Sequence, residues 1–534
     1  MSDLTCVICY EEITPFWKAI VNNCCSGGVF CQQCRRLIDY CPQCRVELTP
    51  QTPLEEKEIF SILNMGRLAD IDLRKKLNKA DKSTISNLFQ YMKNINLLEQ
   101  RDINGWQLIH LTALHKEYSD ICLELLDIYQ SRNLDLIVKN NIGWLPIHYV
   151  CRYQTESVCL KILDIYNLNG YNLEIKEDQT GWLPIHFICR YQTEAVCHRI
   201  MDIYQTRCLD LTIKMNDGWL PIHQICFYQT EGVCLRILEF YEMNNLSFLV
   251  KNNIGWLPIH YICRYQTEAV CHRILDIYES NNLDLEIKEE QTGWLPIHSV
   301  CRYQTESVCL RILDIYESND SNLEIKNDID RLPIHYICRY QTETVCHRIL
   351  DIYQTRGLNL TVKMNDGWFP IHQICRYQTE SVCLRILDIY ESNNLNLDIK
   401  EDKTGWLPIH LICRYQTEAV CQRILYIYKN RGLDLAVTNN YSWLPIHYIC
   451  KWQTEAVCLR ILDIYIELNL DLNEGDETPS VIQLLTNRFT ENHFLINRYY
   501  RLVNGRTIYD RFQGLRNRVQ SLFQNNDYEP IPTA

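Results

Sequence analysis

The chemically most distinctive part of the chain is a group of eight cysteines within the first 44 residues. They form three C-x-x-C pairs and one adjacent pair: Cys6 and Cys9, Cys31 and Cys34, Cys41 and Cys44, and Cys24 and Cys25. Two residues between ligands allow a tight turn to direct both sulfurs at one metal, and zinc takes four such ligands in a tetrahedron. Eight thiolates therefore predict two zinc ions. A segment of about 45 residues buries too little core to fold alone, so the metal would supply the missing stability.

The order of these cysteines resembles a RING finger. The segment opens with CVIC, has FCQQC in its middle and ends with CPQCR, and the resemblance covers residues 1–48. In RING domains the ligands interleave, which implies one zinc on Cys6, Cys9, Cys31 and Cys34 and another on Cys24, Cys25, Cys41 and Cys44. The chain departs from the common pattern at the fourth ligand, usually His, because its first histidine is His110. Either Cys25 serves as this ligand or the site is one ligand short. The alternative is a set of buried or redox cysteines without metal.

The RING resemblance implies a ubiquitin ligase that binds a ubiquitin-charged conjugating enzyme through an apolar patch. The matching residues are Ile8 and Pro42, with Leu37 and Ile38 between them, and Arg45 directly follows the last cysteine. An Arg there acts as a linchpin in active RINGs, bridging ubiquitin and the conjugating enzyme, and the donor fork of Arg suits this bridging. Catalysis would be positioning, with no nucleophile or base from the RING itself. The alternative role for Ile8 and Pro42 is packing around zinc.

Residues 49–100 are predicted to be a helical connector. The stretches LEEKEIFSILNMGRL and STISNLFQYMKNINLL carry apolar residues at three- and four-residue spacing, which is typical of helices.

A repeated unit, GWLPIHYICRYQTEAVCHRILDIY with a variable tail, begins near residue 101. Its histidine recurs every 37 or 38 residues, at His110, His148, His186, His223, His260, His298, His335, His372, His410 and His447. A constant period predicts a solenoid in which each unit packs against its neighbours. Within one unit, Pro146 suits the first turn of a helix, Thr155 suits the N-cap of a second helix, and the tail suits a hairpin-like finger.

The unit resembles the ankyrin repeat, because LPIH matches the Thr-Pro-Leu-His signature and the preceding Gly matches its turn. The resemblance covers residues 101–486, with GDETPSVIQLLTNRF (475–489) as a degenerate terminal cap. Two departures are a Leu in place of the signature Thr, as at Leu145, and a Trp after the Gly, as at Trp144, which is Arg331 in one unit. The predicted fold is therefore mainly α: a small zinc-bound RING domain followed by an ankyrin-repeat solenoid of about ten units and a cap.

The repeated histidines, cysteines and tryptophans favour structural roles over chemistry. Ankyrin histidines bond to neighbouring backbone, so we expect no metal there. Cysteine pairs eight apart, such as Cys151 and Cys159, are expected in the core as small hydrophobes. The tryptophans could form a binding strip, but packing between fingers is favoured. The segment RYQTE hardly changes between units and is expected to maintain the stack.

The residue after the marker histidine varies between units. In ankyrin arrays this position faces the concave groove, so we expect a protein substrate to be contacted by Tyr149, Phe187, Gln224, Tyr261, Tyr336, Gln373 and Tyr448. Unselected drift would give the same variation.

Charge and composition restrict the remaining function classes. Lys+Arg 53 against Asp+Glu 66 gives a net charge of −13, which argues against general nucleic-acid binding. The basic stretch within residues 487–534, a predicted helical tail with a disordered end, could dock an anion, although a helix that closes the array is favoured. No apolar run is long enough to span a membrane and no signal peptide is evident. We expect an intracellular protein, cytoplasmic or nuclear, with its 28 cysteines reduced or metal-bound.

These observations predict a RING-type ubiquitin ligase whose partners are a ubiquitin-conjugating enzyme, ubiquitin and a protein substrate held by the repeats. The alternative is a non-enzymatic adaptor with a structural zinc finger; a weaker one is a nucleic-acid regulator acting through the tail. No phosphate-binding loop, G-x-S-x-G or H-E-x-x-H motif supports another enzyme class. Long arrays of near-identical ankyrin units resemble those of large DNA viruses and intracellular pathogens, so the target could belong to a host cell.

Overall fold

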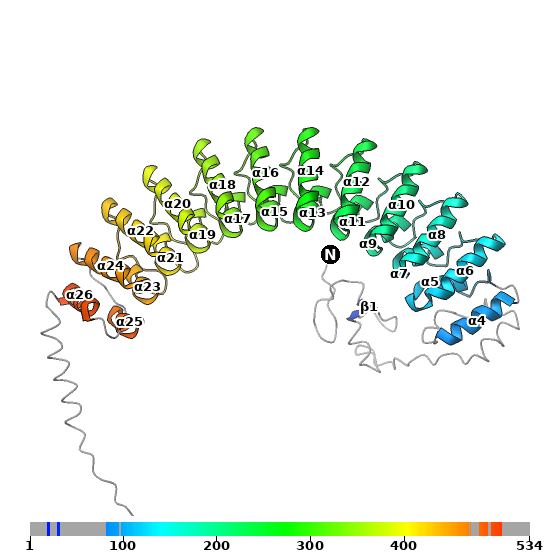
Figure 1. Ribbon diagram of the computed structural model, residues 1–534, viewed down its shortest axis with the longest axis horizontal. Coiled ribbons are helices and arrows are strands. Elements are labelled where there is room, and N and C mark those ends of the chain that lie inside the picture. Colours follow the sequence, from blue (N-terminus) through cyan, green and yellow to red (C-terminus); the bar gives the residue numbers. More distant parts are fainter. Residues whose placement is uncertain are drawn as a thin grey trace, which may run out of the picture. The chain divides into compact units, whose positions relative to one another are not determined.

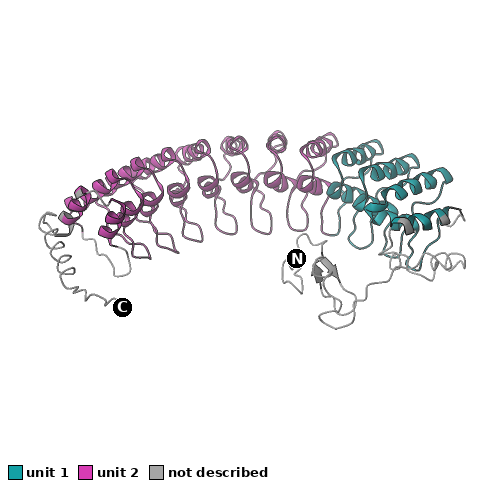
Figure 2. Cartoon of the chain, turned by 60° about the horizontal axis from the view of Figure 1, so that its bottom comes forward, with its two compact units in different colours: residues 1–216 teal, residues 217–534 magenta. Residues whose placement is uncertain are grey.

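The computed structural model describes residues 19–21, 29–31, 82–94, 98–468, 470, 480–489 and 493–504. The chain divides into two compact units, Met1–Asn216 and Asp217–Ala534, which Figure 2 distinguishes by colour.

The cysteine-rich segment contains a short antiparallel strand pair, β1 (Ala19–Val21) and β2 (Val29–Cys31). Ala19 pairs with Cys31, and Val21 pairs with Val29. The seven residues between the strands include Cys24 and Cys25. The chain therefore reverses direction in the middle of the cysteine pattern.

A single helix of the predicted connector is described, α4 (Lys82–Asn94). It lies where the second of the two connector helices is predicted. Two exposed or half-buried ion pairs join it to α6 (Ser119–Arg132): Lys82 to Asp120 at 2.7 Å and Lys93 to Glu124 at 2.8 Å. Leu88 and Phe89 of α4 are buried, so the helix shields apolar surface near the first repeat.

The described repeats of the first unit consist of helix pairs. The helices are α5 (Leu108–Leu114) with the short 3-10 turn η3 (Lys116–Tyr118), α6, α7 (Pro146–Tyr153), α8 (Glu156–Leu168), α9 (Pro184–Tyr191) and α10 (Glu194–Thr206). The first helices of successive pairs pack on one another, α5 on α7 and α7 on α9, and the second helices do the same. The result is two helical layers.

The second unit continues with the same kind of pair. Its helices are α11 (Pro221–Tyr228), α12 (Glu231–Met243), α13 (Pro258–Tyr265), α14 (Glu268–Ser280), α15 (Pro296–Tyr303), α16 (Glu306–Ser318), α17 (Pro333–Tyr340), α18 (Glu343–Thr355), α19 (Pro370–Tyr377), α20 (Glu380–Ser392), α21 (Pro408–Tyr415), α22 (Glu418–Arg431), α23 (Pro445–Trp452), α24 (Glu455–Glu467), α25 (Val481–Arg488) and α26 (His493–Asn504). Figure 1 shows each odd-numbered helix beside its even-numbered partner. The chain is thus a helical solenoid of repeated helix pairs within each unit, as its period predicts.

The helices begin where the sequence pattern predicts. Pro146 occupies the first turn of α7, where the missing N–H of proline has no cost. The second helix buries Val158, Cys159, Ile162 and Leu163 on one side, in the apolar stripe expected for a packed helix. Short helices of this kind are stable because they pack against the pairs before and after them.

The predicted N-cap threonine is at the expected position, but its side chain has another partner. Thr305 precedes α16 with extended backbone angles, and its hydroxyl makes no cap hydrogen bond. It donates instead to Glu268 of the preceding repeat at 2.7 Å. Thr454 of α24 does accept a bond from Val457 N–H. In repeats such as that of Thr305, the threonine hydroxyl therefore links neighbouring repeats and does not cap the second helix.

The fingers between pairs are loops with a tight turn, and no strand occurs in those the structure describes. The glycine before the tryptophan has a positive φ, for example +84° at Gly367. Asp330 and Ser442 hold the same position with φ of 56° and 59°. The hairpin-like finger predicted for the tail is therefore a loop in the described residues, and its tight turn reverses the chain without paired strands.

The predicted terminal cap forms a helix that continues the first-helix layer. Ser480 accepts from Gln483 N–H, and the Gln483 side chain accepts from Ser480 N–H, so α25 begins with a capping box. Arg488 donates to the Cys450 carbonyl of α23 at 3.1 Å. On the other layer, Arg498 of α26 forms an ion pair with Asp463 of α24. The described part of the basic tail therefore packs on the array.

Candidate protein-interaction surface

The predicted metal and RING residues lie outside the described part of the chain. These are Cys6, Cys9, Cys24, Cys25, Cys34, Cys41 and Cys44 with Ile8, Pro42 and Arg45; Cys31 is placed at the end of β2 by its backbone only. Among the residues that the structure describes, no group of three or more His, Cys, Asp or Glu side chains could hold a metal. The zinc prediction stays a prediction.

The repeated histidines are structural, as predicted. His148 is buried, its Nδ1 accepts from Leu145 N–H at 3.0 Å, and its Nε2 bonds to the Ile175 carbonyl at 3.0 Å. Because Nδ1 accepts, the proton lies on Nε2 and is donated to the finger. The ring of His148 thus holds the start of its own helix and ties that helix to the finger that follows it. Burial lowers the pKa of His148 to about 4.

The cysteines within the repeats also match their predicted structural role. Cys301 and Cys309 are buried, and Cys309 donates to the Val300 carbonyl at 3.4 Å. Burial raises the pKa of the Cys301 thiol well above its usual value. Reactive cysteines are low-pKa and accessible, so these thiols are packing groups. Cys208 is the exposed cysteine of the described repeats.

The position after the marker histidine does not lie on an open groove. Seven side chains predicted to contact substrate are buried: Tyr149, Phe187, Gln224, Tyr261, Tyr336, Gln373 and Tyr448. Tyr448 shows why, since its ring lies 4.8 Å from Trp406 of the preceding repeat and 4.9 Å from Trp443 of its own. The tryptophans therefore pack between fingers, as favoured, and cover this position. The prediction that these seven side chains face an open groove is therefore wrong.

The buried position instead matches the residue at the base of its finger. Where the helix carries Tyr, the finger carries Asn nine residues earlier, and the Asn side chain donates to the Tyr hydroxyl at 2.7–2.9 Å in the pairs Asn140–Tyr149, Asn252–Tyr261, Asn327–Tyr336 and Asn439–Tyr448. Where the helix carries Gln, the finger carries Met, in the pairs Met215–Gln224 and Met364–Gln373. This pairing is visible in the aligned repeats and explains their variation by packing.

The third finger type has a buried glutamate and one more residue. Glu289 accepts from Thr292 N–H, Gln291 N–H and Trp294 N–H, as well as from the Thr292 hydroxyl. Burial alone would raise the pKa of Glu289, but these hydrogen bonds lower it overall. The glutamate carboxylate thus satisfies the N–H groups of the turn in this finger, which is one residue longer and contains a Thr–Gly pair.

The segment RYQTE divides between stacking and surface. Gln304 donates to the carbonyls of Cys263 and Gln266 in the preceding repeat, both at 3.1 Å, and Thr305 donates to Glu268 as described. These bonds confirm the predicted stacking role of Gln and Thr. The Arg and Tyr of the segment, such as Arg302 and Tyr303, do not take part in these bonds between repeats; they contact each other instead.

The Arg and Tyr side chains of the second unit form a cation–aromatic ladder along the first helices. Each ring lies between the cation of its own repeat and the cation before it; the set is Arg264, Tyr303, Arg302, Tyr340, Arg339, Tyr377, Arg376, Tyr415, Arg414, Trp452 and Lys451. Ring-to-cation distances run from 4.5 to 5.5 Å. The rings are exposed, at 37–42%. The aromatic faces lower the repulsion between like charges.

The cations of the ladder keep their hydrogen-bonding capacity. Within the described residues, none of the six forms an ion pair or donates a hydrogen bond, and the first helices that carry them have no Asp or Glu. The second helices differ: Arg311 pairs with Asp276 at 3.0 Å and also with Glu279, and Arg348 pairs with Asp314 at 2.7 Å. One layer of the unit is therefore internally neutralised, and the other presents unneutralised positive charge.

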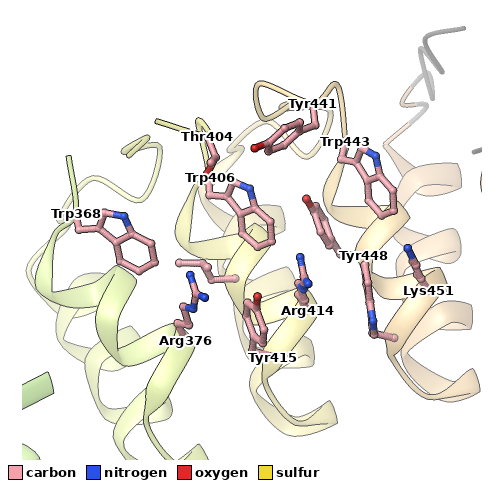
Figure 3. A pocket seen from close by; sticks show the side chains of 12 residues that line it. Trp368, Arg376, Thr404, Trp406, Arg414, Tyr415, Tyr441, Trp443, Tyr448 and Lys451 are labelled. Atoms are coloured by element: carbon pink, nitrogen blue, oxygen red, sulfur yellow. The ribbon is translucent and has the colours of Figure 1, made fainter. Parts of the chain in front are cut away.

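A shallow pocket of about 580 Å³ lies over the last part of the ladder. Figure 3 shows Arg376 and Arg414 on their helices with Tyr415 between them, and the indoles of Trp368 and Trp406 on the finger side. The lining also includes Lys451, Trp452, Tyr441, Trp443, Thr404, Leu411 and the buried Tyr448. The pocket combines aromatic rings with cations that donate no hydrogen bond in the described structure, which suits an anionic group on an apolar stem.

No protein-family model matches the chain, and no curated protein matches it. Among solved structures, the ankyrin repeat domain of Bcl-3 aligns with 13% identity and a TM-score of 0.31 over 46% of this chain and 99% of that one. The predatory endopeptidase Bd0816 from Bdellovibrio bacteriovorus, in complex with the immunity protein Bd3460, aligns with 15% identity and a TM-score of 0.26 over 33% and 84%. The solenoid assignment accordingly rests on the chain's own helix pairs.

Across the described residues, every helix is too short or too polar to traverse a lipid bilayer.

Proposed function

We propose that the chain is a RING-type ubiquitin ligase in which the cysteine-rich head positions a charged conjugating enzyme and the helical repeats hold a protein substrate. The observation that carries the repeat half is the cation–aromatic ladder, a surface of unneutralised charge and exposed rings. Aromatic residues and Arg are the side chains most enriched at the energetic centres of protein interfaces.

The head half rests on the cysteine pattern and on one element of backbone. The β1–β2 pair reverses the chain between the first C-x-x-C pair and the last two. Interleaved zinc sites need such a reversal, because each site takes ligands from two distant parts of the segment. This supports two sites built from Cys6, Cys9, Cys31 and Cys34, and from Cys24, Cys25, Cys41 and Cys44. Zinc there would hold the segment folded, with Ile8, Pro42 and Arg45 on its docking face.

An in vitro ubiquitination assay on the full chain tests the ligase. With a broad panel of conjugating enzymes, we expect ubiquitin chains for the natural sequence and a strong loss for Ile8→Ala and Arg45→Ala. The matched control is Cys208→Ser, a change at an exposed repeat residue, which should transfer ubiquitin normally. Absence of chains with every conjugating enzyme would overturn the ligase.

The second candidate is a non-enzymatic adaptor, favoured by the adjacent Cys24 and Cys25, which are geometrically tight as ligands of one metal. It predicts stable capture of a partner by the natural chain with no ubiquitin transfer. Both functions use the repeat surface, and only the ubiquitination assay distinguishes them: the ligase forms ubiquitin chains and the adaptor does not. A target in an infected host would fit either one.

A further inference from the structure

The cations of the ladder are evenly spaced along the second unit. Arg376 and Arg414 each lie within 5.5 Å of the Tyr415 ring centre, so neighbouring cations are separated by roughly the 8–10 Å that separates packed helices. The same arrangement repeats from Arg264 to Lys451 without an interrupting residue. The preceding repeat has Phe227 at the Arg position. The second unit therefore presents six cations at a near-constant interval.

A polyproline II peptide has a matching period. It rises about 3.1 Å per residue with three residues per turn, so every third side chain lies on one face about 9.3 Å apart. Carboxylates at every third position would each meet one cation of the ladder. The ladder from Arg264 to Lys451 would span about 16 residues of such a peptide.

Carboxylates suit the chemistry of the ladder. The guanidinium carbons of Arg302, Arg339 and Arg376 lie 5.1–5.2 Å from the ring centres of Tyr303, Tyr340 and Tyr377, and their N–H groups donate no hydrogen bond among the described residues. An Arg whose edge is open binds a carboxylate with two parallel hydrogen bonds. Prolines between the acids would keep the peptide extended and would contact the exposed edges of the rings.

A nucleic acid fits the same surface less well. Single strands bind by stacking bases on aromatic faces, but here each ring of the ladder has cations over it from two repeats. The net charge of −13 repels a strand with a phosphate on every nucleotide more strongly than a peptide with one carboxylate in three residues.

We infer that the ladder from Arg264 to Lys451 is a docking track for an extended, proline-containing peptide with Asp or Glu at every third residue. The inference rests on the proposed function, since it names the class of substrate segment that the repeats would hold.

Fluorescence anisotropy with the full chain tests the spacing. The probe is a labelled peptide of six Glu-Pro-Ala triplets, compared with a peptide of the same composition in scrambled order and one with Gln in place of Glu. We expect the triplet peptide to bind at least about tenfold more tightly than either, and added salt to weaken it. Equal affinity for the triplet and scrambled peptides would overturn the inference.

Two charge-matched variants test the surface in the same assay. The ladder variant carries Arg302→Gln, Arg339→Gln and Arg376→Gln; the control carries Arg311→Gln, Arg348→Gln and Arg385→Gln on the second helices of the same repeats. Both lose three positive charges. We expect roughly tenfold or greater loss of triplet-peptide affinity for the ladder variant and less than threefold for the control. Equal losses would overturn the inference, and so would tighter binding of an oligothymidylate probe.

The peptide comparison on the natural chain remains decisive if the ladder variant fails to fold. No ubiquitin or conjugating enzyme is present in these measurements. Loss of the ligase in the ubiquitination assay therefore leaves the docking track standing, and failure of triplet binding leaves the ligase standing.

Discussion

The side-chain amide of Asn252 donates to the hydroxyl of Tyr261 at 2.8 Å inside the core of one repeat. The side-chain oxygen of Asn252, Oδ1, accepts from Trp256 N–H at 2.9 Å and from Ile254 N–H at 3.2 Å. One side chain therefore holds both the finger and the helix in place. In the repeat at Met364, Asp366 accepts from Trp368 N–H instead. The array therefore uses interchangeable sets of residues for the same turn.

The interchangeability predicts a rescue. Tyr261→Phe should cost about 1–2 kcal/mol because the buried Asn252 amide loses its acceptor. The triple change Asn252→Met, Ile254→Asp and Tyr261→Gln installs the set found near Met364 and should recover most of the loss that Asn252→Met causes alone. Chemical denaturation followed by circular dichroism measures both. An additive loss in the triple variant would contradict the exchangeable sets.

Much of this fold is predictable from the sequence, because the repeat period and the position of Pro146 and its equivalents fix the helix pairs. The structural role of His148 also follows from the resemblance. The burial of Tyr448 does not follow, because it depends on indoles from two repeats closing over one ring. The pairing of finger and helix residues was present in the aligned repeats. The ladder does not follow from the sequence, because an Arg-Tyr pair that hardly changes between units indicates a stacking role as readily as an exposed surface.

Acid should weaken the array in a window set by its histidines. Burial lowers the pKa of His260 to about 4 and of His298 to about 3. Between pH 6.5 and about 4 the unfolded chain therefore binds protons that the folded chain does not, and stability falls with falling pH by about 1.4 kcal/mol per pH unit for each such histidine. Below that, Glu289 adds to the loss, because its folded pKa is lowered and its contribution disappears as it is protonated.

Helicity measured against pH checks this expectation. The natural chain should lose helix cooperatively between about pH 6 and 4. His260→Asn should lower the free energy of unfolding at neutral pH. It should also reduce the slope of that free energy against pH by about one bound proton, because one buried histidine is missing. Cys208→Ser serves as the control with an unchanged profile. A helical signal that is flat from pH 7 to pH 4 would contradict the role of buried neutral histidines.

Two glycines with similar backbone angles should respond differently to alanine. Gly357 has φ +63° and open space around the position of a Cβ, whereas a Cβ on Gly367, at φ +84°, would lie 2.2 Å from the Asp402 backbone nitrogen of the next finger. Gly357→Ala should cost about 1–2 kcal/mol for the left-handed conformation. Gly367→Ala should cost at least about 1 kcal/mol more, because the next finger must move. Equal denaturation midpoints for the two variants would show that the fingers do not pack this closely.

Zinc analysis separates the head from the repeats. The purified full chain should contain two zinc ions, and Cys25→Ser should lower the content toward one if Cys25 is the fourth ligand of the second site. The described repeats contain no group of side chains able to hold a metal, so chelation should remove zinc and leave most of the helical signal intact. Cys208→Ser, at an exposed cysteine of the array, should keep the full zinc content. A chain that binds no zinc would remove the metal-dependent head and, with it, the ligase, because without metal the short segment has no means of holding Ile8, Pro42 and Arg45 on one face. Two zinc ions in the Cys25→Ser variant would instead place the fourth ligand elsewhere and keep the head.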